Sequence, residues 1–121
     1  MRKKGNQAGL EAFNQEAVRL HALMDRDPRQ AIQEARALSS DTPVGGVLFT
    51  GLKAGVLIDA GASAGDKQAI EEGIALFRGL SATRPDEGGY HYNLGNGLAA
   101  LAVQEEYTGL DWYLSTASLR H

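Results

Sequence analysis

The side chains best suited to acid–base or metal chemistry in this 121-residue chain are its three histidines, His21, His91 and His121. They lie far apart in the sequence, and none has a second histidine at the four-residue spacing that places two metal ligands on one helix face. The chain contains no cysteine, which excludes disulfides, thiol catalysis and thiolate metal ligands. The sequence therefore predicts no metal site and no cofactor.

One further pair has a spacing used in catalysis elsewhere. Arg84 and His91 superficially resemble the Arg-then-His pattern of HEPN-type ribonucleases. Pro85 follows Arg84 directly, however, and the interval falls in a predicted connector rather than on one helix. The serines lie outside any Gly-x-Ser-x-Gly motif, so helix capping explains them better than nucleophilic catalysis. We therefore expect no catalytic residue and no enzyme activity.

The overall charge and the amino-terminal residues argue against nucleic-acid and membrane partners. The formal net charge is -3 and the pI about 5.5, whereas nucleic-acid-binding domains are usually basic. The single basic run, Arg2-Lys3-Lys4, is interpreted as part of a flexible, solvated tail over residues 1–7. No uninterrupted apolar run reaches the roughly 18 residues that a membrane-spanning helix needs. Together with the absence of cysteine, these features favour a cytoplasmic location.

Hydrophobic residues recur every three or four positions along most of the chain, which is the spacing of helices with one buried face. Start and stop signals divide this pattern into predicted helices over about 8–24, 28–40, 44–62, 66–82, 88–104 and 110–121. Asp27-Pro28 is a typical helix start, and residues 63–66 and 105–109 are predicted turns. No segment has the alternation of a strand. The predicted fold class is all-α.

The glycines repeat with a period of 44 residues, because Gly51 and Gly65 are followed by Gly95 and Gly109. A glycine inside a helix costs about 1 kcal/mol relative to alanine, so matched glycines suggest a packing role. We expect Gly51, Gly73 and Gly95 to let neighbouring helices approach closely. Gly95→Leu is then expected to overpack and to destabilise the fold by about 1–3 kcal/mol.

Several of these positions resemble the tetratricopeptide repeat (TPR), a pair of antiparallel helices that stacks in arrays. Leu94-Gly95 is similar to the first-helix pair of that family. Gly73, Phe77 and Leu80 are similar to its second-helix row, and Pro85 occupies the terminal proline position. The segment over residues 65–77 is similar to part of some bacterial TPR-like arrays. The period here exceeds the about 34 residues of a standard TPR, which implies longer helices or turns.

The resemblance implies a right-handed α-solenoid of about three antiparallel helix hairpins. The hairpins would cover residues 8–40, 44–82 and 88–121, within a single domain over residues 8–121. Each would bury its apolar face against its neighbour, with Phe77 filling the space beside the packed glycines. Repeat arrays normally end in a polar-faced capping helix, and the sequence predicts none. We therefore expect the chain to be the N-terminal part of a longer protein, or to pair with a second copy.

The resemblance also implies a groove lined by the first helix of each hairpin. Tyr92, Asn96, Ala99 and Ala100 would face it, with Asn96 at the position of the family's peptide-backbone-binding asparagine. The carboxylate clamp of one TPR subgroup is not expected, because Tyr92 is not basic. A hydrogen bond between helices explains Asn96 as well as ligand contact does, and both interpretations stay open.

The predicted function is a non-catalytic interaction or scaffold module that binds a peptide or a partner helix in this groove. One alternative is self-association as a homodimer through the open carboxyl-terminal repeat. Another is a regulatory repeat segment of a larger multidomain enzyme whose catalytic part lies beyond His121. The predicted partner is accordingly a protein or peptide, or a second copy of the chain.

Overall fold

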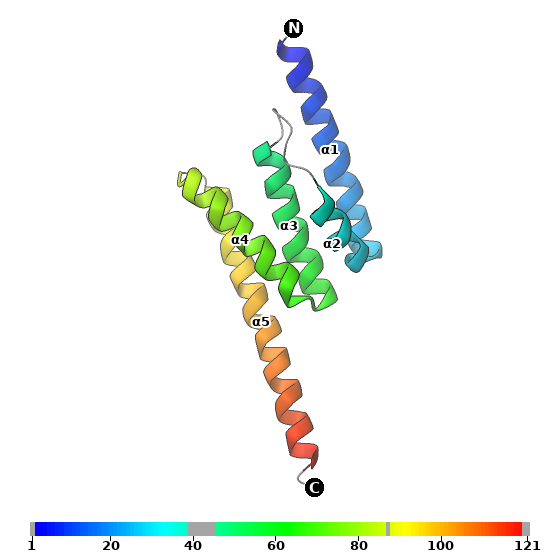
Figure 1. The fold of residues 1–121 in the computed structure, drawn as a ribbon, viewed down its shortest axis with the longest axis vertical. Coiled ribbons are helices and arrows are strands. Elements are labelled where there is room, and N and C mark those ends of the chain that lie inside the picture. The colour runs from blue at the N-terminus through cyan, green and yellow to red at the C-terminus, as the bar shows by residue number, and fades with distance from the viewer. Residues whose placement is uncertain (1, 39–45, 87, 120–121) are drawn as a thin grey trace.

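The chain is built from helices throughout the part that the structure describes (Figure 1). The computed structural model describes the backbone of residues 2–38, 46–86 and 88–119, and the side chains of residues 10–106 within those ranges. The helices are α1 (Arg2–Arg26), α2 (Pro28–Ala37), α3 (Gly46–Ala64), α4 (Lys67–Thr83) and α5 (Gly88–Leu119). These described residues contain no strand, so the predicted all-α class is confirmed.

The turn between α1 and α2 forms where the sequence predicts a helix start. The carboxylate of Asp27 accepts a hydrogen bond from the backbone N–H of Gln30 at 3.2 Å, which satisfies one of the free donors at the start of α2. Pro28 occupies the first helical position, where its missing N–H costs nothing. A short polar cap thus reverses the chain within two residues.

The turn between α3 and α4 depends on a glycine. Gly65 has φ of 70°, a left-handed conformation that residues with a Cβ adopt only at a cost. The N–H of Asp66 then bonds to the carbonyl of Gly61 at 2.8 Å, which closes the end of α3. The Asp66 carboxylate accepts a hydrogen bond from the N–H of Ala69 at 3.1 Å and so begins α4.

Two predicted boundaries are wrong. Residues 2–7, expected to be a tail, belong to α1, which begins at Arg2. The turn expected over residues 105–109 and the separate helix after it are absent, because α5 runs without interruption from Gly88 to Leu119. A single glycine such as Gly109 costs a helix only about 1 kcal/mol, and no proline adds to that cost. The third hairpin over residues 88–121 is therefore one long helix; residues 120 and 121 lie outside the described part.

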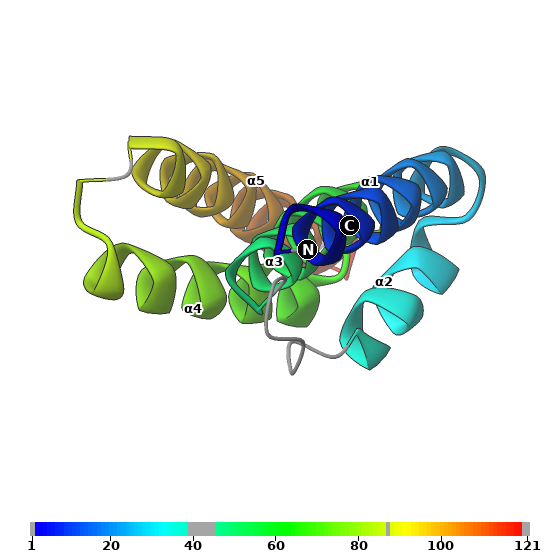
Figure 2. The same cartoon turned by 90° about the horizontal axis from the view of Figure 1, so that it is seen from above.

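The helices alternate in direction along the chain and fall into two layers. In Figure 1 each helix runs opposite to the one before it, and α5 extends past the ends of α3 and α4. Seen from above, α1, α3 and α5 form one layer and α2 and α4 the other (Figure 2). Each helix contacts the next one along the chain, and α1, α3 and α5 also contact each other in that order.

Helix α3 lies at the centre of this arrangement and joins two hydrophobic clusters. The first cluster packs α1 and α2 against α3 and α4 through the buried residues Leu20, Leu23, Ala31, Ile32, Ala35, Leu52, Val56, Leu57, Ala60 and Ala69. The second packs α4 against α3, with α5 covering its edge, through Ala54, Ile58, Ile70, Ile74, Phe77 and Leu80. Because successive residues of α3 point into different clusters, this helix is apolar on more than one face.

The apolar character of α3 also makes it long and hydrophobic enough, by length and composition alone, to cross a membrane. A core helix of a soluble protein passes the same test. Seven of its residues, Leu52, Ala54, Val56, Leu57, Ile58, Ala60 and Gly61, are buried against the other helices. Packing between the two layers therefore accounts for the apolar character of these seven positions.

Gly73 lies at the closest approach of α4 to α3. A Cβ on Gly73 would lie 2.6 Å from Cγ1 of Ile58 and 2.7 Å from the backbone oxygen of Ala54. Contacts this short do not occur in folded proteins, so the two helices pack at this distance only because the position has no side chain. Phe77, one turn later, is 2% exposed in the second cluster.

The roles expected for Gly51 and Gly95 are not found, because a Cβ at either position would meet nothing within 4 Å. Overpacking by Gly95→Leu is accordingly no longer expected. The close approach of α5 occurs instead at Gly97, where a Cβ would lie 2.8 Å from Cδ1 of Ile58 and 2.9 Å from Cγ1 of Ile74. Gly95 and Gly97 point to different sides of α5, since two residues rotate a helix by about 200°.

Candidate functional site

A face of α3 remains uncovered between α1 and α5. We call it the groove face and define it by Leu48, Gly51, Gly55 and Asp59, which recur every three or four residues and so share one side of the helix. From above, α1 and α5 lie to either side of α3 on the opposite side from α4 and α2 (Figure 2). The two outer helices of this layer therefore flank the groove face.

The glycines of the groove face leave backbone exposed. No atom lies within 4 Å of a Cβ built on Gly51 or Gly55, so neither position is occupied by a neighbouring helix. Glycine at such positions permits the close approach of another backbone or a ligand. Gly51, which the sequence predicts as a helix contact, thus borders open space instead.

A small pocket of about 90 Å³ opens on this face, between α3 and α5. Its lining combines polar and apolar residues: Gly55, Ile58, Asp59, Phe77, Asn93 and Asn96. Asp59 comes from α3, and Asn93 and Asn96 come from neighbouring positions of α5, three residues apart and therefore on one side of that helix. We call this the α3–α5 pocket.

The carboxylate of Asp59 has no cation beside it. In the part of the chain that the structure describes, Asp59 takes part in no ion pair and no hydrogen bond. Asp59 is exposed at the surface, yet partial desolvation by its neighbours raises its pKa, and the charge of His21, on α1, acts in the opposite direction. The pocket therefore holds a carboxylate whose charge is poorly compensated.

Asp59 gives the folding equilibrium a defined pH dependence. Its pKa is raised in the folded state, so the folded protein binds this proton more tightly than the unfolded chain does. The resulting stabilisation is present below the ordinary aspartate pKa and is lost as the pH rises through the raised value. Relative to Asp59→Asn, the wild type is expected to lose thermal stability as the pH rises above the ordinary aspartate pKa of about 4. The melting temperatures of both proteins, measured as the pH rises, test this prediction. An increase in the melting temperature of the wild type relative to that of Asp59→Asn would contradict it.

The four residues expected to contact a partner lie in different surroundings on α5. Asn96 lines the α3–α5 pocket, whereas Ala100 packs against the second cluster. Tyr92 is 71% exposed, and Ala99 is exposed as well. The structure thus brings Asn96 together with Asp59 and Asn93, which the sequence analysis did not single out. The spacing Gly51–Gly55–Asp59 is the signal that would have pointed to this face.

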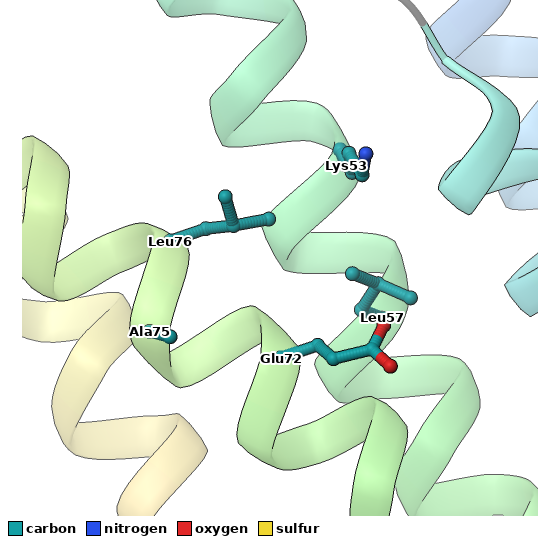
Figure 3. A pocket seen from close by; sticks show the side chains of 5 residues that line it. All are labelled: Lys53, Leu57, Glu72, Ala75 and Leu76. Atoms are coloured by element: carbon teal, nitrogen blue, oxygen red, sulfur yellow. The ribbon is translucent and has the colours of Figure 1, made fainter.

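A larger pocket of about 360 Å³ lies between α3 and α4, away from α5. In Figure 3 the side chains of Leu57 and Leu76 lie between the two helices, and Glu72 reaches from α4 toward α3. Glu72 accepts hydrogen bonds from Arg36 at 2.9 and 3.1 Å, and Lys53 Nζ donates to the backbone oxygen of Arg36 at 3.2 Å. These polar groups already serve to join α2 to α3 and α4, which favours a structural role.

Among the described residues, His21 lies on α1 and His91 on α5. None of the histidine and acidic side chains in this part of the chain group in a way that would hold a metal ion. Arg84 caps the end of α4, while His91 lies in the first turn of α5 with its Nε2 2.9 Å from the backbone oxygen of Pro85. That contact gives His91 a role in the connector between the two helices.

Comparison of the chain with models of known protein families, with curated proteins and with solved structures gives no match. Its function is therefore argued from its own geometry.

Proposed function

We propose that the chain is a TPR-like, right-handed α-solenoid that binds a segment of another protein on the groove face, without catalysis. Support for the stacked arrangement comes from the order of helix contacts, in which each helix meets the next and α3 meets both α1 and α5. In a closed bundle the first and last helices would also meet, whereas α1 and α5 lie on opposite sides of α3 (Figure 2). Such an open array leaves a face for a partner.

The observation that carries the proposal is the α3–α5 pocket beside two glycines whose Cβ positions are free. Extended segments bind through their backbone as well as their side chains, and both need access. Gly55 gives the backbone access, while Asn93 and Asn96 supply amide donors and acceptors at the wall. Tyr92 is exposed on the same helix and is proposed to extend the contact. Ala99 and Ala100 are proposed to border it.

A peptide-library selection tests this function with a matched pair of variants. Gly55→Leu places a side chain over the groove face, and Gly79→Leu places the same side chain in open space on α4, in the other layer. Peptides selected on the wild type are expected to lose at least about tenfold in affinity for Gly55→Leu, equivalent to about 1.4 kcal/mol. They should retain their affinity for Gly79→Leu.

The selection contradicts the proposal if no sequence is enriched over an unrelated helical protein. Equal affinity for both leucine variants contradicts it too, because the bound peptides would then lie elsewhere. Circular dichroism of each variant shows whether the helices are retained. In addition, the peptides selected on the wild-type protein are expected to bind Asn96→Ala more weakly. This result would separate ligand contact by Asn96 from a purely structural role.

Self-association is the second candidate, and exposed apolar side chains on α5 favour it. Leu98 and Val103 are 42% and 47% exposed on α5, a helix that packs mainly against α4 and α3. A dimer formed through α5 would dissociate when Leu98 and Val103 are changed to Glu, because a charge would be buried at the contact. Light scattering that finds the wild type monomeric at high concentration would exclude this candidate. A role as regulatory segment of a larger enzyme is a third proposal, and we further propose a cytoplasmic location.

A further inference from the structure

The side chains that line the α3–α5 pocket offer more hydrogen-bond acceptor atoms than donor atoms. Asp59 contributes two carboxylate oxygens, and Asn93 and Asn96 each contribute an amide oxygen beside their NH₂ donors. No lysine, arginine or histidine lines the pocket. Its floor is formed by Ile58 and Phe77, which are both buried and apolar. This combination matches a ligand with a positive end and an apolar stem.

Asp59 also differs from the acidic side chains at the other helix contacts. Glu34 pairs with Arg19 across α1 and α2, and Glu72 pairs with Arg36 across α2 and α4. Each of these carboxylates has its counter-ion within the chain. Asp59 has no ion pair within the described residues, and His21, on α1, is the one charged group that lowers its pKa. The contact between α3 and α5 is therefore the place where a positive charge is missing.

We propose that the α3–α5 pocket receives a lysine or arginine side chain of the bound protein segment, with Asp59 as its counter-ion. This inference rests on the proposed function and names the chemistry of the partner. The cationic head would donate hydrogen bonds to Asp59 and to the amide oxygens of Asn93 and Asn96. Its aliphatic stem would lie against Ile58 and Phe77, as the stems of long basic side chains commonly do on apolar surfaces.

The size of the pocket fits such a group. A volume of about 90 Å³ exceeds the roughly 10–15 Å³ that one water molecule requires and is far below the 300–1,000 Å³ of small-molecule sites. It therefore suits a single side chain. Gly55 lets the backbone of the partner run close to α3, so that one residue can reach the floor.

Simple amino-acid derivatives test the pocket without a known partner. We would titrate the full chain with N-acetyl-arginine amide and N-acetyl-lysine amide and follow backbone amide NMR signals. N-acetyl-norleucine amide supplies the stem without the charge, and N-acetyl-glutamate amide reverses the charge. The basic derivatives are expected to shift the signals of Gly55, Asp59, Asn93 and Asn96 in a saturable way. The norleucine and glutamate derivatives are expected to bind at least about tenfold more weakly.

Two variants connect the shifts to the carboxylate. Asp59→Asn keeps the shape and removes the charge, and it should weaken binding of the basic derivatives at least about tenfold. Asp25→Asn removes an exposed charge from α1 and should leave binding unchanged. Equal weakening by both variants would mean general attraction to a negative surface and would overturn the inference. Equal affinities of the basic and norleucine derivatives would also overturn the inference, because the positive charge would then contribute nothing to binding.

The pH dependence supplies a further check. Binding of the basic derivatives should weaken as the pH falls and Asp59 becomes protonated, and Asp59→Asn should remove that dependence. His21, on α1, is the other charged group acting on Asp59, so His21→Gln is included to separate its contribution. A pH dependence that survives in Asp59→Asn and disappears in His21→Gln would overturn the assignment to Asp59.

The outcomes separate this inference from the proposed function. Selected peptides that are blocked by Gly55→Leu but carry no enriched lysine or arginine would support groove binding and overturn the basic side chain. Peptides that are not enriched at all, together with saturable arginine binding at Asp59, would overturn the protein-binding function while the cation site stands.

Discussion

Phe77→Ala is expected to lower the free energy of unfolding by about 3–5 kcal/mol, the range for removing a large aromatic side chain from a core. Phe77 is 2% exposed and packs in the second cluster with residues of α3 and α4. Its removal leaves a cavity that the surrounding helices fill only in part. Since the free energy of unfolding of a small domain is about 5–15 kcal/mol, this single substitution would remove a large fraction of it.

Urea denaturation followed by circular dichroism measures the effect. Leu98→Ala is the matched control, because Leu98 is a large apolar residue that is 42% exposed and belongs to neither cluster. We expect the control to lose much less stability. Similar losses in both variants would mean that the second cluster contributes no more than the surface of α5, contrary to the packing described here.

Gly73→Ala is expected to destabilise the fold by about 1–3 kcal/mol, although alanine is the better helix former. The new Cβ would meet the backbone oxygen of Ala54 at 2.7 Å, and a backbone atom inside a helix cannot move aside without shifting α3. Gly95→Ala is expected to stabilise by up to about 1 kcal/mol, because nothing lies within 4 Å of its Cβ position. The two identical substitutions should therefore have effects of opposite sign.

Gly97→Ala provides an intermediate case for the same denaturation experiment. Its Cβ would meet side-chain atoms rather than backbone, namely Cδ1 of Ile58 at 2.8 Å and Cγ1 of Ile74 at 2.9 Å. Side chains can change rotamer, so the cost should fall between those of Gly73→Ala and Gly95→Ala. If all three glycines give equal changes, helix propensity and not helix contact controls these positions.

The central place of α3 explains why these effects concern the whole domain. Leu57 and Val56 on this helix belong to the first cluster, whereas Ala54 and Ile58 belong to the second. A change that displaces α3 at the contact with Gly73 is transmitted to the packing of α1 and α2. The groove face is part of the same helix, so binding measurements on core variants need the folded fraction to be known. The variants at Gly55 and Asp59 lie at the groove face rather than in either cluster, so they disturb the packing of the core less.

The helix cap and the glycine turn were predictable from short sequence patterns, because each of these structures depends only on residues that are neighbours in the sequence. The cap at Asp27-Pro28 and the glycine turn before Asp66 need only a few side chains and backbone groups, and both form as expected. Whether residues 105–109 form a turn or continue a helix could not be predicted from the local sequence. A glycine and polar residues are compatible with either a turn or a continuing helix, and the chain continues as α5.

The sequence by itself determined the all-α class, the starts of α2 and α4 and the absence of any cysteine chemistry, since these follow from periodicity, capping and composition. Only the tertiary structure decided what the glycines do. Gly73 and Gly97 face other helices and Gly51, Gly55 and Gly95 face open space, although all five are glycines within helices. The difference depends on which side of each helix packs against a neighbouring helix. That side is set by how the helices cross in the fold, and the residue type at the position does not reveal it. The same crossing brings Asp59 of α3 beside Asn93 and Asn96 of α5 and so creates the candidate site.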